Sequence, residues 1–168
     1  MFPKTSLFFA ALSLLSFTNA AVLITRQELN AVLNEHNTFR AQHGAAPLAW
    51  SNNLAKAAQN WGSRCEFKHS GGAVGPFGEN LAAGAGGGYK PVDGVKQWNA
   101  EVKDYDPKNP QFSHFTQVVW KATKEVGCAA VQCGDKIFGP DFKDSTYLVC
   151  EYSPPGNVIG QFAENVQK

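Results

Sequence analysis

Two histidines and two glutamates carry the most evident chemistry of this sequence: His69, Glu79, Glu101 and His114. Imidazole nitrogens and carboxylate oxygens can bind a divalent ion or act as acids and bases. Their spacings of 10, 22 and 13 residues match no compact metal motif such as His-Glu-x-x-His, so only a tertiary fold can bring them together. Taken by spacing alone, each is more often an ordinary solvated or capped polar group.

Two serines stand next to these histidines, which raises the alternative of nucleophilic catalysis. Ser70 follows His69 and Ser113 precedes His114. Neighbours in sequence usually point apart, and a nucleophile needs its base within about 3.2 Å. No Gly-x-Ser-x-Gly elbow surrounds either serine. A metal-dependent or serine hydrolase therefore remains an alternative, and the sequence does not favour it.

Three helices are predicted around these residues. A spacing of three and four residues is typical of an amphipathic helix, and Gly44 and Pro47 end the pattern of Leu29, Val32, Leu33, His36, Phe39, Arg40 and His43. A second helix is expected over residues 51–62 and a third over residues 92–105.

The remaining segments predict a long loop and a sheet. Residues 69–89 are rich in glycine and lack periodicity, so we expect a loop broken by a short helical turn. Strands are predicted over residues 116–120, 127–133 and 146–152, which are rich in Val, Thr, Cys and aromatic residues. Helices that mostly precede strands indicate an α+β fold in which helices cover a sheet.

The first twenty residues are expected to be a secretory signal peptide. Lys4 begins a short basic region, an apolar stretch follows, and Ala20 ends a small-residue cleavage site. The apolar stretch is shorter than the roughly 20 residues that a membrane anchor needs. The mature chain, residues 21–168, is then expected to be a single extracellular domain without stable membrane anchoring.

Composition narrows the possible partners. The whole chain has 15 basic and 14 acidic residues, and removal of Lys4 leaves a formal charge of zero. Nucleic-acid binding draws on clustered Lys and Arg, which this chain lacks, so no nucleic-acid partner is expected. Four cysteines in an exported chain favour two disulfides, for which three pairings are open.

Five stretches resemble the CAP superfamily, which groups cysteine-rich secretory proteins, antigen 5 and plant pathogenesis-related protein 1. The two signature-like stretches are SHFTQVVWKAT at 113–123 and YLVCEYSPPGN at 147–157. The others are EHNTFR at 35–40, HS at 69–70 and GENL at 78–81. They follow the family's order over nearly all of the mature chain, and the likeness is greatest to fungal secreted pathogenesis-related 1 proteins.

The sequence departs from the family pattern in three places. Ser113 stands where Gly or a charged residue is usual, and Glu151 follows Cys150 where Asn or another polar residue is usual. Plant relatives usually carry six cysteines, whereas residues 106–111 here hold two prolines where one plant disulfide would close a loop. We therefore expect this loop to be somewhat freer than in the plant proteins.

The resemblance implies a fold and a site. The fold would be a three-layer α-β-α sandwich with a central antiparallel sheet, and the disulfides would join Cys65 with Cys133 and Cys128 with Cys150. A central cleft would be lined by His69, Glu79, Glu101 and His114. We expect the two histidines to bind zinc or magnesium directly and the two glutamates to act through water or by fixing each imidazole. His36 and His43 are expected to be structural.

The resemblance also implies binding of sterols and, in some relatives, fatty acids. Aromatic residues flank the proline-rich loop beside His114 and are the candidate lipid contacts: Tyr105, Phe112 and Phe115. We therefore expect an extracellular lipid-binding protein that exports or sequesters its ligand, rather than an enzyme. A third alternative is signalling, by release of a C-terminal peptide that would start at Ser153.

Overall fold

The computed structural model describes residues 24–168. The predicted signal peptide, residues 1–20, lies outside the described residues. The chain runs through five α-helices, one short 3-10 helix and four strands within the described part.

Two helices form where the apolar periodicity predicts them. Helix α1 spans Arg26–Gln42 and helix α2 spans Asn52–Gly62. Thr25 caps α1, because its hydroxyl accepts a hydrogen bond from the Glu28 backbone while the Glu28 carboxylate accepts one from the Thr25 backbone. The buried side chains of α1 lie four residues apart: Val32, His36 and Arg40.

Four strands form one sheet. They are β1 (Ala49–Trp50), β2 (Gly78–Gly84), β3 (Glu125–Gly134) and β4 (Ser145–Ser153), in the spatial order β1-β3-β4-β2. The β2–β4 and β3–β4 pairs are antiparallel, whereas β1 pairs with β3 in parallel. The three longer strands therefore form the expected central antiparallel sheet, and the two-residue edge strand β1 adds one parallel pair to it.

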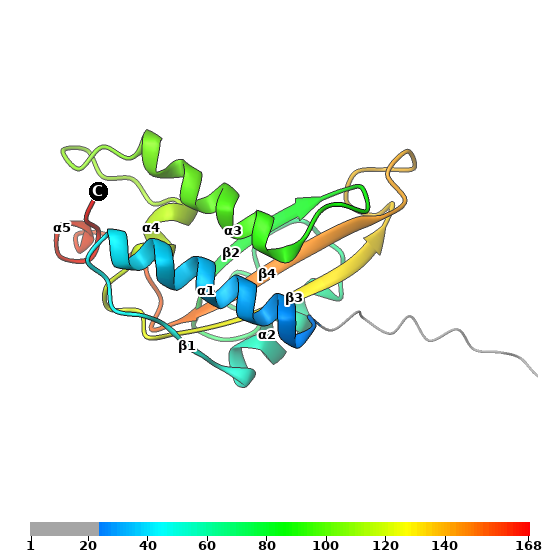
Figure 1. The fold of residues 1–168 in the computed structure, drawn as a ribbon, viewed down its shortest axis with the longest axis horizontal. Coiled ribbons are helices and arrows are strands. Elements are labelled where there is room, and N and C mark those ends of the chain that lie inside the picture. The colour runs from blue at the N-terminus through cyan, green and yellow to red at the C-terminus, as the bar shows by residue number, and fades with distance from the viewer. Residues whose placement is uncertain (1–23) are drawn as a thin grey trace, which may run out of the picture.

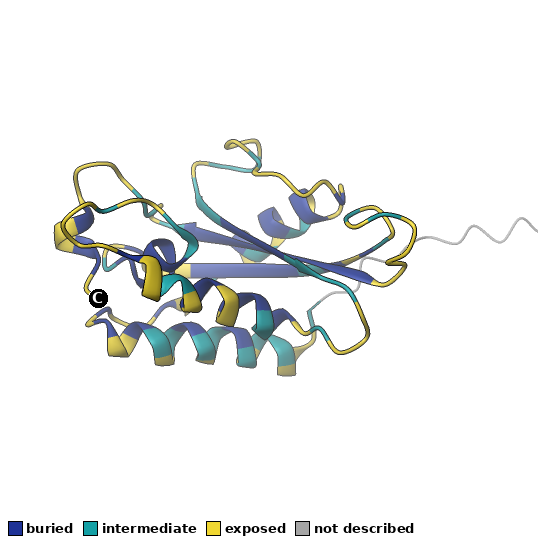
Figure 2. Cartoon of the chain, turned by 90° about the horizontal axis from the view of Figure 1, so that it is seen from above, coloured by how far each residue is buried: buried dark blue, intermediate teal, exposed yellow. Residues whose placement is uncertain are grey.

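Helices cover both faces of this sheet, which confirms the three-layer sandwich (Figure 1). Helices α1, α3 (Pro91–Ala100) and α4 (His114–Val119) pack on one face, and α2 packs against β3 and β4 on the other. The 3-10 helix η1 (Glu101–Asp104) continues α3, and α5 (Phe162–Asn165) lies near the C-terminus. Figure 2 shows the buried sheet between these layers.

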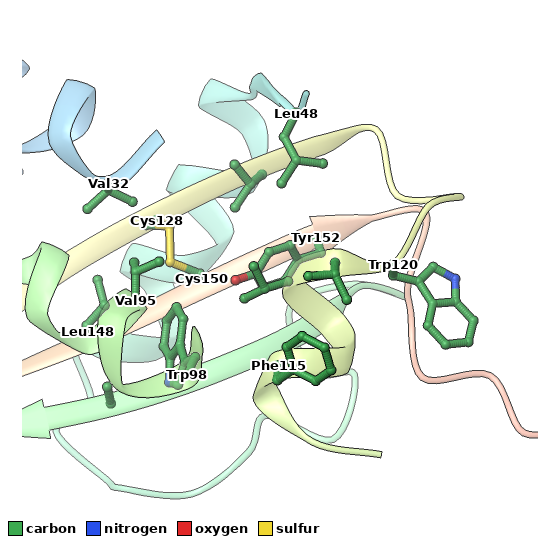
Figure 3. Close-up of a cluster of buried hydrophobic side chains, with 14 of the residues drawn as sticks. Val32, Leu48, Val95, Trp98, Phe115, Trp120, Cys128, Leu148, Cys150 and Tyr152 are labelled. Carbon is green, nitrogen blue, oxygen red and sulfur yellow. A yellow bond between two sulfur atoms is a disulfide. The ribbon is translucent and has the colours of Figure 1, made fainter. Parts of the chain in front are cut away.

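The central strand β4 is buried on both faces. Alternate side chains enter the larger core, which Figure 3 shows beside Val95 and Trp98: Leu148, Cys150 and Tyr152. The alternate positions Tyr147 and Val149 point to the opposite face and enter the core beneath α2, which also contains Trp61. Residues of β4 that differ by one position therefore belong to different faces of the sheet.

Strand β2 corrects the prediction of a loop over residues 69–89. It pairs with β4 over seven residues, from Gly78 opposite Tyr152 to Gly84 opposite Thr146. The strand contains no β-branched residue, so its local propensity is weak. Hydrogen bonding to β4 at the edge of the sheet therefore stabilises β2, although its local sequence does not favour a strand.

Helix α4 corrects the prediction of a strand over residues 116–120. The Ser113 hydroxyl accepts a hydrogen bond from the backbone of Thr116, at 3.2 Å, and so caps the helix. Every residue from Phe115 to Val119 is buried. Tertiary packing and the cap therefore outweigh the strand preference of Thr116, Val118 and Val119.

Both disulfides join the cysteines that the family resemblance paired. Cys65 bonds to Cys133, and Cys128 bonds to Cys150. The first bridge links the segment after α2 to β3, and the second joins directly opposite residues of β3 and β4. Within residues 24–168, no helix is both long and apolar enough to cross a membrane.

Candidate functional site

One cavity brings together all four candidate residues. It has a volume of about 730 Å³, and its wall includes His69, Glu79, Glu101 and His114. Glu79 comes from β2, Glu101 begins η1 and His114 begins α4. Residues separated by up to 45 positions in the chain therefore share one wall, which the linear spacing alone did not show.

His69 and Glu79 form the first hydrogen-bonded pair of the cavity. The His69 Nδ1 atom lies 2.7 Å from Glu79 Oε1, and the Ser70 backbone donates to the same oxygen at 2.9 Å. Burial alone would raise the pKa of Glu79, but the accepted hydrogen bonds, first that from His69, outweigh burial and lower it. The bond to Glu79 raises the pKa of His69 in turn.

His114 and Glu101 form a second pair with the same arrangement. The His114 Nδ1 atom lies 2.7 Å from Glu101 Oε1. Glu101 Oε2 accepts hydrogen bonds from the backbone of His114 at 2.8 Å and of Phe115 at 3.2 Å, so this carboxylate also satisfies the first turn of α4. Burial opposes ionisation of Glu101, but the bonds from His114 and the backbone lower its pKa below the ordinary value.

A chain of buried hydrogen bonds fixes α4 relative to the sheet. The Asn80 amide donates to the His114 carbonyl at 3.1 Å and to the Tyr152 hydroxyl at 3.3 Å. The Tyr152 hydroxyl lies 2.8 Å from Nε2 of His36, whose Nδ1 lies 2.8 Å from the Val32 carbonyl. Since a carbonyl only accepts, His36 Nδ1 donates and Nε2 accepts from Tyr152. Burial lowers the pKa of His36 to about 4, which keeps this imidazole neutral.

The other histidine of α1 also makes internal contacts. His43 Nδ1 donates to the carbonyl of Gln167 at 2.7 Å, and its ring packs against Phe39 and Phe115. Neither His36 nor His43 lines the cavity. These internal hydrogen bonds agree with the expectation that His36 and His43 are structural.

The cavity contains two imidazole nitrogens of the kind that ligate divalent ions. Each Nδ1 donates to a carboxylate, so each Nε2 carries a lone pair, and no hydrogen bond within residues 24–168 engages either Nε2. No cluster of three or more His, Cys, Asp and Glu side chains in that part of the chain is arranged to hold a metal ion. An ion here would therefore take two protein nitrogens, with water filling its other positions.

A second, smaller hollow adjoins the cavity. It has a volume of about 360 Å³ and is lined mostly by apolar side chains: Pro110, Gln111, Phe112, Ile159, Gly160, Phe162 and Ala163. Gln111 and Phe112 line both spaces. We call the smaller hollow the apolar groove.

A sequence profile of the CAP family, described as the cysteine-rich secretory protein family, matches residues 33–152. That match spans all four cavity residues and most of the chain. The chain belongs to the CAP family.

Relatives of known name support this assignment. The chain is 44% identical over 145 residues to Protein PRY2 of Saccharomyces cerevisiae, covering 81% of this chain and 40% of that protein. It is 40% identical over 140 residues to Pathogenesis-related protein 1B of Nicotiana tabacum, covering 77% and 76% of the two chains. The chain thus spans well under half the length of the yeast relative.

Solved structures share the fold. The crystal structure of NaASP2 with Zn2+ superposes with a TM-score of 0.66 and 22% sequence identity, covering 82% of this chain and 84% of that chain. At this identity the likeness concerns the fold of the CAP domain alone.

The three candidate lipid contacts of this CAP domain occupy different environments. Phe115 is 0% exposed and belongs to the buried cluster of Figure 3. It packs against Phe39, His43 and Tyr105, so it offers no free surface to a ligand. Tyr105 is buried and lines only the cavity. Phe112 is 71% exposed and lines both the cavity and the apolar groove.

Sequence reasoning missed the far wall of the groove. Ile159, Phe162 and Ala163 lie some 50 residues after Phe112, beyond the second signature-like stretch. No local pattern links these two segments. A weak signal was present, because Ile159 and Phe162 are the two largest apolar residues of the C-terminal segment, residues 158–168.

Neither Ser70 nor Ser113 of this CAP domain is hydrogen-bonded through its hydroxyl to a histidine within the described residues. The Ser113 hydroxyl caps α4 by accepting from Thr116, and the Ser70 hydroxyl accepts from the Gly72 backbone at 3.4 Å. No observation of the site therefore favours a serine nucleophile.

Proposed function

We propose that this CAP domain is an exported binding protein that takes up an apolar lipid of the sterol or fatty-acid class in the apolar groove. One observation carries the proposal. Phe112 and Ile159 are 71% and 88% exposed, yet they lie on the wall of the same hollow. Two large apolar side chains that share a concave exposed surface are typical of a site for an apolar ligand.

The size and energetics of the groove suit such a ligand. A volume of 360 Å³ lies within the range of about 300–1,000 Å³ that small-molecule sites occupy. Full burial of a Phe or Ile side chain contributes about 1.5–3 kcal/mol. Covering Phe112 and Ile159 therefore supplies a substantial part of the free energy of binding.

The histidine cavity would hold a divalent ion beside this groove. His69 and His114 would be its protein ligands, and Glu79 and Glu101 would fix the two imidazoles through their Nδ1 atoms. Such an ion would supply positive charge in the cavity that shares Gln111 and Phe112 with the groove. We propose a binding role for this cavity, not a catalytic one.

Export is part of the same proposal. Two disulfides are typical of proteins that fold in an oxidising compartment. The basic start, short apolar stretch and small-residue junction of residues 1–20 agree with a secretory route. In the extracellular space, the protein would shield a lipid from water and so carry or sequester it.

Direct binding measurements test the lipid site. We expect labelled ergosterol or cholesterol, and in a second arm labelled palmitate, to bind the secreted protein saturably and to be displaced by the unlabelled compound. Phe112→Ala combined with Ile159→Ser should weaken binding at least about tenfold, which corresponds to about 1.4 kcal/mol.

Phe138→Ala is the matched control. Phe138 is also an exposed phenylalanine, but it lies in the β3–β4 connection, at the end of the molecule opposite α5 (Figure 1). Its loss should leave the affinity unchanged. Absence of saturable binding, or an equal loss of affinity in the control and the groove variant, would contradict the proposed lipid-binding function.

Substitution of both cavity histidines distinguishes a lipid-binding protein from a hydrolase. In His69→Ala/His114→Ala, ion binding measured by calorimetry should be lost, whereas lipid binding should largely persist if the groove works independently of the ion. Loss of a hydrolytic activity in this variant would instead support the enzyme alternative.

A further inference from the structure

The Glu79 carboxylate has a second acidic neighbour behind it, Glu151. The two residues lie directly opposite each other on the antiparallel strands β2 and β4. Directly opposite residues of an antiparallel pair project their side chains to the same face of the sheet, with Cβ atoms about 4.5–5.5 Å apart. The side chains of Glu79 and Glu151 therefore lie on the face of the sheet that α2 covers.

Glu151 is deeply buried. Its residue is 1% exposed, and its Oε1 atom has no hydrogen-bond partner within the described residues. Glu79 Oε2, the oxygen that neither His69 nor Ser70 contacts, is also buried without a partner there. An ionised carboxylate without partners in such a place costs several kcal/mol, so two of them side by side are not tenable.

None of the ion pairs formed by residues 24–168 supplies a cation to Glu151. On its other side lies Gly127 of β3, which has no side chain and packs against the backbone of α2. The groups that interact with it electrostatically are acidic or phenolic, namely Glu79, Tyr147 and Tyr152. The His69 imidazole binds the other oxygen of Glu79.

We propose that Glu151 carries a proton at neutral pH and donates it in a hydrogen bond to Glu79, which makes Glu151 a positioning residue for the His69 side of the cavity. Glu151 is then a neutral carboxylic acid and Glu79 remains the acceptor. Glu79 uses one oxygen for Glu151 and the other for His69 and Ser70. This sequence of bonds, from Glu151 through Glu79 to His69 Nδ1, leaves the lone pair of the neutral His69 ring on Nε2.

The electrostatic balance agrees with this direction of the bond. Burial, and then the negative charge of Glu79, raise the pKa of Glu151 well above its usual range, while the pKa of Glu79 is lowered. Two carboxyl groups that share one proton are the familiar outcome when like charges cannot both ionise. The second pair of the cavity differs, because Glu101 is supported by backbone N–H groups instead.

The proton can be observed without any bound ion or lipid, so this test does not depend on the proposed function. Infrared spectroscopy of the metal-free protein at pH 7 should show the C=O stretching band of a neutral carboxylic acid. The band should be lost in Glu151→Gln. Absence of the band from the unaltered protein, or its persistence in Glu151→Gln, would overturn the proposal.

The positioning role is tested by ¹⁵N NMR of the histidine rings, at a pH where both cavity histidines are neutral. Glu151→Gln keeps a donor toward Glu79 and should preserve the Nδ1–H form of His69. Glu151→Met fills a similar volume without a donor and should lose the predominance of that form. His114 is the internal control, since its partner Glu101 has no contact with Glu151 and its tautomer should not change.

Two outcomes would contradict the positioning role. One is an unchanged His69 tautomer in Glu151→Met, which would mean that Glu151 only fills space. The other is an equal change at His69 and His114, which would indicate a general loss of structure. If Glu151→Met fails to fold, the infrared spectra still decide whether Glu151 carries the proton. The ¹⁵N spectrum of Glu151→Gln then decides whether another donor at this position preserves the Nδ1–H form of His69.

Discussion

Each cavity histidine is hydrogen-bonded through its Nδ1 atom to a carboxylate. The bond selects one tautomer and holds the ring in one orientation, so the entropy of ordering the side chain is already lost before any ligand arrives. The two carboxylates are supported differently. Glu79 is buried beside another acid, whereas Glu101 accepts from the backbone at the start of α4. Substitutions of the two acids should therefore have different consequences.

Glu101 gives a pH-dependent prediction. Its pKa is lower in the folded protein, so its stabilisation is present above the unfolded pKa near 4.5 and is lost as pH falls through the folded pKa. Glu101→Gln should lower the free energy of unfolding by about 1.5–3 kcal/mol at pH 7, the usual worth of hydrogen bonds to a charged group. Urea denaturation at pH 7 and at pH 3 measures this difference.

The contrast between the two pH values is the control. As the pH falls from 7 through the lowered pKa of Glu101, this carboxylate loses its charge in the unaltered protein, so the two proteins should approach each other in stability. A difference of the same size at both pH values would show that the charge of Glu101 is not what supports α4.

At the scale of elements, Arg40 joins α1 to the end of α4. Its guanidinium donates to the carbonyls of Val118 at 2.7 Å and Trp120 at 2.9 Å, where α4 ends. It also donates to the Ala46 carbonyl at 2.8 Å and the Thr123 carbonyl at 3.1 Å. The negative end of a helix favours a cation, and burial nevertheless lowers the pKa of Arg40 to about 10. Arg40 thus holds one end of α4 while Glu101 holds the end that carries His114.

Arg40→Leu should therefore be strongly destabilising. It leaves several buried carbonyls without donors, each at a cost of about 1–3 kcal/mol, so we expect a loss of at least about 3 kcal/mol in the free energy of unfolding. Arg26→Leu, an exposed arginine of the same helix, is the matched control and should change stability by less than about 0.5 kcal/mol. Similar losses in both variants, measured by denaturant unfolding, would refute the role given to Arg40.

At the scale of the whole molecule, the two disulfides restrict the unfolded chain to different extents. Cys65–Cys133 closes a separation of 68 residues and Cys128–Cys150 one of 22. The first bridge spans β2, α3 and α4, and so encloses Glu79, Glu101 and His114. The second only reinforces a hairpin whose strands are already paired.

Replacing the cysteines by alanine should reveal this difference. The chain-entropy relation assigns about 4 kcal/mol to the longer loop and about 3 kcal/mol to the shorter one. We expect Cys65→Ala/Cys133→Ala to lower the denaturation midpoint more than its counterpart does, and to weaken ion binding as well. The opposite order would indicate that packing around the fully buried Cys128–Cys150 bridge, rather than loop entropy, dominates its contribution.

Local signals in the sequence were sufficient for α1, α2, α3, β3 and β4. The spacing of Val32, His36 and Arg40 indicates one buried helical face, and Gly44 and Pro47 end the pattern. The two histidines and two glutamates of the cavity were also expected to share a cleft, but through resemblance to the CAP family. Their spacing alone could not group them, because convergence depends on how strands and helices pack.

Tertiary structure alone decided the elements with weak or conflicting local signals. Strand β2 lacks β-branched residues and is a strand because β4 pairs with it, while α4 has strand-favouring residues and is a helix because of its cap and its buried packing. The same holds for the groove and for Glu151. Whether Ile159 meets Phe112, or Glu151 faces Glu79, depends on strand register and on contacts between distant segments, which a linear pattern does not contain.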